Sequence, residues 1–321
     1  MPTVGLKPFS YTASAMLLGL LLIALASISW GTTGATMTLL MRDGAVGPLF
    51  VGWVRLAVAA VCLLLGLVVT DRLAAHRARD GRPRTGRDRP GVSVSYALLG
   101  LAMAAYQVCY FRAVTLTGVA VTALIAICSA PLMIALLAAV LLGERLTVMV
   151  RASLAIAVIG TALLVVGPRE LGQVSGHSWV GALLALGAGV SYAVYAVAAK
   201  RVLARVAPLT VAAITFTLAA IFLAPALLGE RVSSSTLTKG WPLLLYLGVG
   251  PTAAAYALFT AGLRRVPATA AGITSLLEPL TATLLGVLAF GESLGALGIA
   301  GALLLLFSFG LLVVSGRPLV S

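Results

Sequence analysis

The apolar stretches of this sequence hold few side chains that can carry a charge or a proton, and Glu278 is the most prominent of them. It lies in the run SLLEPLTATLL, where an ionised carboxylate would cost about 2.5–3.5 kcal/mol at the centre of a lipid bilayer. A carboxylate in such a place normally faces a cavity or pairs, so Glu278 is a candidate for recognising an amine or for loading and releasing a proton. The alternative is a structural hydrogen bond that holds a kinked helix to its neighbour.

Two prolines interrupt apolar runs at matching places. Pro279 follows Glu278 directly, and Pro131 occupies the corresponding position of an earlier run. Proline removes a backbone hydrogen bond and kinks a helix, which leaves a carbonyl oxygen free one turn earlier. We therefore expect both prolines to expose polar backbone groups and to act as hinges. Three hydroxyl groups close to the prolines can add to the same polar site: Ser129, Thr274 and Ser275.

Arg55 lies about one turn inside an apolar run. Its long side chain can extend to the membrane surface while its methylene groups stay in the apolar region. Alternatively, the guanidinium group faces a cavity and pairs with an anion or a carboxylate. In the second case Arg55 and Glu278 would bracket a zwitterion.

Aromatic side chains recur within the apolar runs. They are explained either by ordinary packing or by a cavity wall that accepts cations and apolar groups on the ring faces. The candidates for the wall are Trp30, Tyr106, Tyr110, Tyr192, Tyr195 and Tyr256.

The composition indicates which elements position these residues. Of the 321 residues, 61% are hydrophobic and 10% are charged, whereas a soluble domain has roughly 25% charged residues. So few charges cannot coat a soluble domain, and the sequence therefore predicts an all-α membrane protein that crosses the bilayer several times. The net charge of +13 comes from cations in the connectors, so we expect anionic lipid headgroups as their partners and no nucleic acid.

Ten segments are apolar enough to span a membrane, since about 20 apolar residues are needed. They are 16–40, 48–70, 93–114, 118–142, 150–166, 179–199, 208–228, 241–263, 268–290 and 294–315. The connector 71–91 has seven arginines and is predicted to be a flexible cytoplasmic loop, with a specific lipid or regulatory partner as the alternative. With the N-terminus inside, the cytoplasmic connectors and termini carry sixteen Lys and Arg residues and the outer ones five. This distribution predicts a multi-pass protein of the cell membrane with both termini in the cytoplasm.

An internal repeat divides the chain. Residues 113–166 align with residues 261–314 at a constant offset of 148, and both copies carry a proline followed by Gly-Glu, ending at Glu144 and Glu292. We predict two five-helix repeats, 1–168 and 169–321. Because five is odd, the second copy must enter the membrane from the opposite side. Inverted repeats around a central cavity are typical of secondary transporters, and the two glutamates are expected to cap helices or close gates.

The sequence resembles the EamA family of the drug/metabolite transporter superfamily. The resemblance is carried by Trp30-Gly31, by Arg55-Leu56-Ala57 and by the doubled motif from Pro131 to Glu144 and from Pro279 to Glu292. It implies ten helices around a central cavity and transport, often export, of amino acids, related metabolites or toxic small molecules.

No HExxH or GxxxxGK[ST] motif occurs in the sequence. We therefore expect neither a metal nor a cofactor nor an enzyme, and an ion gradient, such as that of protons, or the substrate's own gradient as the energy source. An uncoupled facilitative exchanger is the nearest alternative. A membrane-embedded lipid-modifying enzyme and a non-transporting scaffold are alternatives of other classes.

Overall fold

A computed structural model describes residues 12–41, 47–79, 94–166, 178–228, 240–291 and 295–315. Within these residues ten helical spans are long and apolar enough to cross a membrane, which confirms the predicted fold class. Apolar runs of this length become helices because a helix pairs every backbone N–H and C=O inside its own segment, as a bilayer demands. Leu17, Leu21, Leu25 and Ile28 recur on one face of the first helix and are each roughly half exposed, as expected of a surface that meets lipid.

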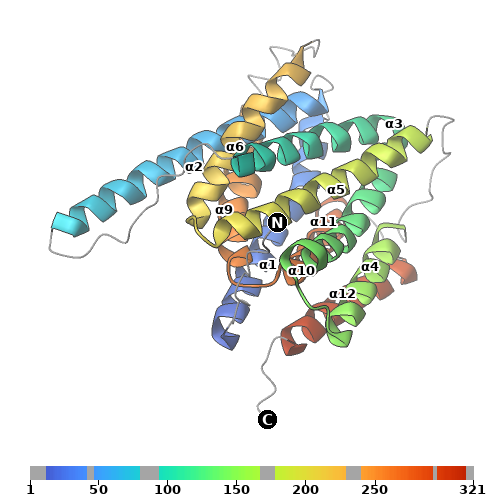
Figure 1. Ribbon diagram of the computed structural model, residues 1–321. Coiled ribbons are helices and arrows are strands. Elements are labelled where there is room, and N and C mark those ends of the chain that lie inside the picture. The colour runs from blue at the N-terminus through green and yellow to red at the C-terminus, as the bar shows by residue number, and fades with distance from the viewer. Residues whose placement is uncertain are drawn as a thin grey trace.

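The first five spans form four helices, which can be followed in Figure 1. Two predicted spans are joined, because only Gly118, at φ 77°, departs from helical geometry between them, a conformation that glycine adopts without steric cost. The helices are α1 (Ala13–Met41), α2 (Pro48–Arg79), α3 (Val94–Leu142) and α4 (Val148–Val166).

The last five spans are more interrupted. A π-helical turn, η2, divides the eighth span, and the ninth is broken at Leu276. The elements are α5 (Ser178–Leu203), α6 (Pro208–Leu223), η1 (Ala224–Leu227), α8 (Trp241–Gly248), η2 (Val249–Ala254), α9 (Ala255–Leu263), α10 (Ala268–Ser275), α11 (Leu277–Phe290) and α12 (Ala296–Ser315).

The start of the arginine-rich connector is helical, and the prediction of a loop from residue 71 is wrong for that part. Helix α2 continues through Arg79 and projects from the bundle (Figure 1). The sequence DRLAAHRAR contains strong helix formers and neither Gly nor Pro, whereas Gly81 and Pro83 come only afterwards. Residues 80–91 lie outside the described part of the chain.

The packing exchanges one helix between the two sequence halves. Helix α5, from the second half, packs along α3, while α1, from the first half, packs against α9, α10 and α11. We call these groups the α3–α5 unit and the α1–α11 unit. The small residues Gly31 and Gly189 make these contacts close: a Cβ on Gly31 would lie 2.5 Å from Thr281, and one on Gly189 would lie 2.1 Å from Ser129.

Helices α4 and α12 cross beside these units (Figure 1). Gly160 faces Gly301 at the crossing, and the hydroxyl of Ser308 donates to the carbonyl of Ser153 over 2.8 Å. At the offset of 148, Gly160 corresponds to Ser308 and Ser153 to Gly301. The repeat therefore relates the contact between Gly160 and Gly301 to the contact between Ser308 and Ser153. This relation is consistent with two inverted repeats.

Candidate functional site

A cavity of about 520 Å³ lies between the two units. This size is within the range of about 300–1,000 Å³ that is common for small-molecule sites. Ten residues singled out in the sequence line it: Trp30, Arg55, Tyr106, Tyr110, Pro131, Tyr192, Tyr256, Ser275, Glu278 and Pro279.

Aromatic rings form much of the cavity wall, and they come from both units. Trp30 on α1 lies 4.8 Å from Tyr256, measured between ring centroids. On the opposite side, Tyr106 stacks on Tyr110 at 5.8 Å and contacts Tyr192 of α5 at 5.9 Å. Such rings offer apolar area together with faces that attract cations.

Glu278 contributes a carboxylate to this wall and is half-buried. It lies in the first turn of α11, where the helix dipole favours a negative charge. That turn exists because the ninth span is broken at Leu276. The break follows from Pro279, because the proline ring clashes with the carbonyl of Ser275, four residues earlier. The same proline thus starts α11 and places the carboxylate on the cavity. Helix α3, by contrast, continues through Pro131 without a break.

Arg55 is half-buried on α2 and lines the cavity, as the second of its two interpretations requires. Its Nε donates to the hydroxyl of Thr252 over 3.0 Å. It is close enough to Glu278 for an electrostatic interaction. No ion pair joins the two side chains in the described part of the chain. Both residues line the cavity, so their charges face the same space.

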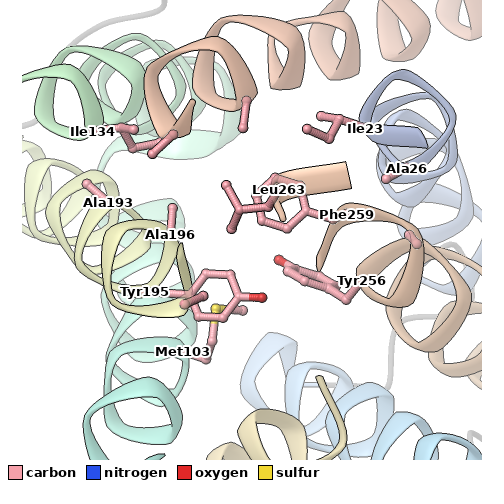
Figure 2. Packing of buried hydrophobic residues seen from close by; sticks show 14 of the residues in the cluster. Ile23, Ala26, Met103, Ile134, Ala193, Tyr195, Ala196, Tyr256, Phe259 and Leu263 are labelled. Carbon is pink, nitrogen blue, oxygen red and sulfur yellow. The ribbon is translucent and has the colours of Figure 1, made fainter. Parts of the chain in front are cut away.

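Three candidates are not brought into the cavity. Tyr195 is fully buried in the core beside Met103 and turned towards Tyr256 (Figure 2). The hydroxyls of Ser129 and Thr274 donate to carbonyls of their own helices, those of Ala126 and Ala270. Their expected role in substrate binding is therefore not supported. A short hydroxyl side chain on a helix commonly donates to a carbonyl of the preceding turn of the same helix.

Several cavity residues were not anticipated from the sequence. Thr252 is buried in η2, and Gln107 is a buried amide on α3. The aromatic wall also includes Phe111 and Phe216. The Gly250-Pro251 pair was an available signal for Thr252, since an interrupted span in a membrane protein is tolerated where it lines a cavity or packs in protein. The described residues contain no group of three or more His, Cys, Asp or Glu side chains that could hold a metal.

Glu144 closes one end of the space between the units. Its Oε1 accepts from the backbone N–H of Ala268 over 2.6 Å, and its Oε2 accepts from the N–H and the hydroxyl of Thr269 over 3.1 and 2.8 Å. Glu144 follows Gly143, whose φ of 70° ends α3, and it thereby caps the first turn of α10 in the other unit. The contact has the geometry of a helix cap, and gate closure by Glu144 stays a prediction.

Lys200 makes a second bridge at the same end. This side chain of α5 is 3% exposed, and its Nζ donates to the carbonyls of Leu263 and Val266, each over 2.6 Å. Both acceptors flank the turn between α9 and α10. Glu144 and Lys200 therefore hold the α1–α11 unit against the α3–α5 unit, and we call this pair the clamp. Glu292, the repeat equivalent of Glu144, lies outside the described residues.

The cavity extends away from the clamp. Its lining continues to Met37 near the end of α1, to Pro48 at the start of α2 and to Gly286 near the end of α11. All three lie towards the end of the bundle opposite to the clamp. The space is therefore asymmetric: it extends towards one membrane face and is bridged by the clamp at the other.

Ten apolar spans around an aromatic cavity with charged groups define a polytopic membrane protein of the transporter class. The chain belongs to the EamA-like transporter family, whose model matches it twice, over residues 17–166 and 179–314. The two matches correspond to the two repeats seen in the sequence.

Relatives of the chain have similar descriptions. It is 36% identical over 304 residues to an uncharacterized transporter, YwfM, of Bacillus subtilis, covering 93% of this chain and 94% of that protein. It is 32% identical over 260 residues to a protein of Streptantibioticus cattleyicolor described as a "probable terminal-alkyne amino-acid exporter", covering 78% and 81%. It is 34% identical over 201 residues to the aromatic amino acid exporter YddG of Ancylobacter novellus, covering 62% and 69%.

One solved structure matches 97% of this chain and 100% of its own, with a TM-score of 0.76 and 23% sequence identity. At this identity the match supports the fold.

Proposed function

We propose that the protein is a secondary transporter that exports amino acids or related small amphipathic metabolites by alternating access, coupled to protons through Glu278. The observation that carries the proposal is the cavity, which combines an aromatic wall with a carboxylate and, within the described residues, is bridged by the clamp at one end. Its size and lining suit a small molecule with an apolar part and a cationic group. The descriptions of two relatives as amino-acid exporters support the same substrate class.

The arrangement of the two units supports alternating access. With the clamp formed, a substrate can reach the cavity only from the opposite face. Opening the clamp and closing the other end would expose the same site to the membrane face at which the clamp lies. The two arrangements are similar in energy because the two halves are nearly symmetric. With both termini in the cytoplasm, the clamp lies at the cytoplasmic end, and the state described faces outwards.

We assign the coupling of this exchange to protons to Glu278. It is the cavity carboxylate, and its repeat equivalent is Ala130, which cannot titrate. A group that binds a proton when the cavity faces one side, and releases it when the cavity faces the other, links proton flow to substrate movement.

The test is uptake by proteoliposomes of a labelled panel of amino acids, amines and sugars, with and without an imposed pH gradient. We expect uptake of apolar and aromatic amino acids, accelerated when the gradient drives protons against the substrate. Uptake without any effect of the gradient would indicate an uncoupled exchanger. No uptake of any compound by correctly folded protein would contradict the proposal.

A further inference from the structure

The proposed function leaves open which chemical group of the substrate the cation of the cavity recognises. Arg55 supplies that cation, and its surroundings are unusual for an arginine in a membrane span. The side chain neither reaches for the membrane surface nor pairs with a carboxylate in the described part of the chain. It is held instead by a hydroxyl group, that of Thr252.

The position of Arg55 depends on the interruption of the eighth span at η2. Pro251 has no N–H and cannot bond the carbonyl of Leu247, four residues earlier. The hydroxyl of Thr252 donates to that carbonyl instead, over 2.7 Å, within the π-helical turn η2. Because a hydroxyl has a single proton, its oxygen then acts towards Arg55 only as an acceptor. The acceptor is fixed in direction, and Thr252 is 1% exposed, so water does not compete for it.

This arrangement uses one edge of the guanidinium group and leaves the other for a ligand. The bond to Thr252 occupies Nε, while the N–H groups on the two Nη atoms bond to no described residue. A guanidinium group fixed in this way presents a planar pair of donors to a carboxylate.

The charge balance of the cavity selects among anions. Glu278 faces the same space as Arg55, so a dianion such as a phosphate monoester would be repelled by the carboxylate. A zwitterion satisfies both groups, because its carboxylate meets Arg55 and its ammonium group meets Glu278. The remaining wall is aromatic and suits an apolar side chain.

We propose that Arg55, positioned by Thr252, is a carboxylate subsite, and that the substrates are zwitterions with a free carboxylate, an amine and an apolar side chain. This inference rests on the proposed function in one respect, namely that the cavity is the transport site. Thr252 is a positioning residue, since it acts on the ligand through Arg55.

The experiment compares three probes that differ at one group: phenylalanine, phenylalaninamide, which lacks the anionic carboxylate, and phenethylamine, which lacks the carboxyl group. Competition with labelled phenylalanine in proteoliposomes gives the relative affinity of each. For the wild-type protein we expect phenylalanine to compete at least about tenfold better than the other two, since a hydrogen bond to a charged group contributes about 1.5–3 kcal/mol.

Four variants locate the origin of this preference. In Thr252→Val, which keeps the shape and removes the hydroxyl, the preference for phenylalanine over its amide should fall about five- to tenfold, whereas Thr252→Ser should retain it. Arg55→Lys should also lose most of it, because an ammonium group cannot donate in a planar pair. Thr260→Val is the matched control: this buried hydroxyl, about two turns further along the same span and outside the cavity lining, donates to the carbonyl of Tyr256, and its loss should leave the ratio unchanged.

The ratio of two affinities is insensitive to a partial loss of folded protein, and Arg55→Lys still tests the subsite if Thr252→Val fails to fold. An unchanged ratio in Thr252→Val, or a wild type that accepts the amide as well as the acid, would overturn the carboxylate subsite while leaving transport intact. A wild type that transports none of the probes would overturn the proposed function itself.

Discussion

The distribution of charge over the cavity wall departs from the symmetry of the repeats. Ala130 and Glu278 are equivalent positions, and both line the cavity, one from each unit. The neighbouring prolines, Pro131 and Pro279, line it as well, so at this pair of matched sites only the second carries a carboxylate. A single carboxyl group of this kind can bind and release one proton in each transport cycle.

Glu278→Gln tests this role. The amide keeps the size of the side chain but cannot carry a proton, so we expect stimulation of transport by a pH gradient to disappear while exchange of substrate across the membrane persists. The measurement is uptake into proteoliposomes over a range of imposed gradients. Thr281→Val is the control on the same helix, since this hydroxyl donates to the carbonyl of Leu277 and lies outside the cavity. Full stimulation in the glutamine variant would remove the proton role.

At the scale of elements, the interruptions of the helices position the functional groups. The break at Leu276 gives Glu278 a helix N-terminus, and η2 turns the hydroxyl of Thr252 towards Arg55. The start of α10 offers free N–H groups to Glu144 of the other unit. An uninterrupted bundle of the same ten spans would provide neither of the first two features, whereas the start of α10 is also the start of the ninth span and would remain.

Glu144→Ala should weaken the clamp. Loss of a capping side chain costs about 0.5–2 kcal/mol, which would raise the population of open clamps by roughly 2- to 30-fold. The reporter is Ala271→Cys, one turn after the cap and 1% exposed, in a background without Cys62, Cys109 and Cys128. The rate of its reaction with a membrane-impermeant thiol reagent, added at the face where α1 begins, should rise accordingly.

Arg145→Ala provides the control for this experiment. Arg145 is the next residue along and is exposed, so its removal should leave the labelling rate unchanged. Equal rates in Glu144→Ala and the parent protein would show that the clamp does not limit access from this face.

At the scale of the whole molecule, the two sequence halves are not the two packing units. Each half gives its first helix to the other, through α1 and α5, and the halves meet again where α4 crosses α12. This exchange allows the cavity to be shared between the units while the crossing holds the halves together. The backbones at the crossing approach closely because glycine has no side chain there.

Gly301→Ala should destabilise the molecule. Its Cβ would lie 2.5 Å from the carbonyl oxygen of Gly160 and 2.6 Å from the backbone nitrogen of Leu164, and backbone atoms cannot move aside. We expect a loss of about 1–3 kcal/mol in the free energy of unfolding, seen as a lower Tm in detergent. Gly310→Ala, also on α12, has open space at its Cβ and should be neutral or slightly stabilising. Similar Tm values for the two variants would contradict the close crossing.

The topology gives a further prediction. Ten spans put both termini on one side, and the excess of Lys and Arg in the corresponding connectors predicts that this side is the cytoplasm. A fluorescent protein fused to either terminus should therefore mature, whereas a periplasmic reporter enzyme fused there should stay inactive. The opposite result at either end would reverse the assignment of the clamp to the cytoplasmic face.

The sequence by itself determined the elements that depend on local composition. Twenty apolar residues in a row must form a spanning helix, so the ten spans could be placed to within a few residues, and a repeat with an offset of 148 is visible without coordinates. Glu278 and Pro279 stood out for the same reason, because a charge or a proline in an apolar run is costly wherever the helix lies. The helix through Arg79 was missed because the arginines were interpreted by their charge and not by their helix propensity.

Only the tertiary structure decided which faces of the helices meet. Tyr192 and Tyr195 lie on one helix within a turn of each other, yet the first lines the cavity and the second is fully buried in the core. Residues three apart lie only about 60° from each other around a helix, and in a span that is apolar on all sides no pattern marks which of them faces the cavity. The same holds for contacts across the bundle, such as Arg55 with Thr252 and Glu144 with α10, which join residues more than 120 positions apart. Such pairs depend on how the helices pack, and packing between apolar helices is set by the fit of side chains that the linear sequence does not display.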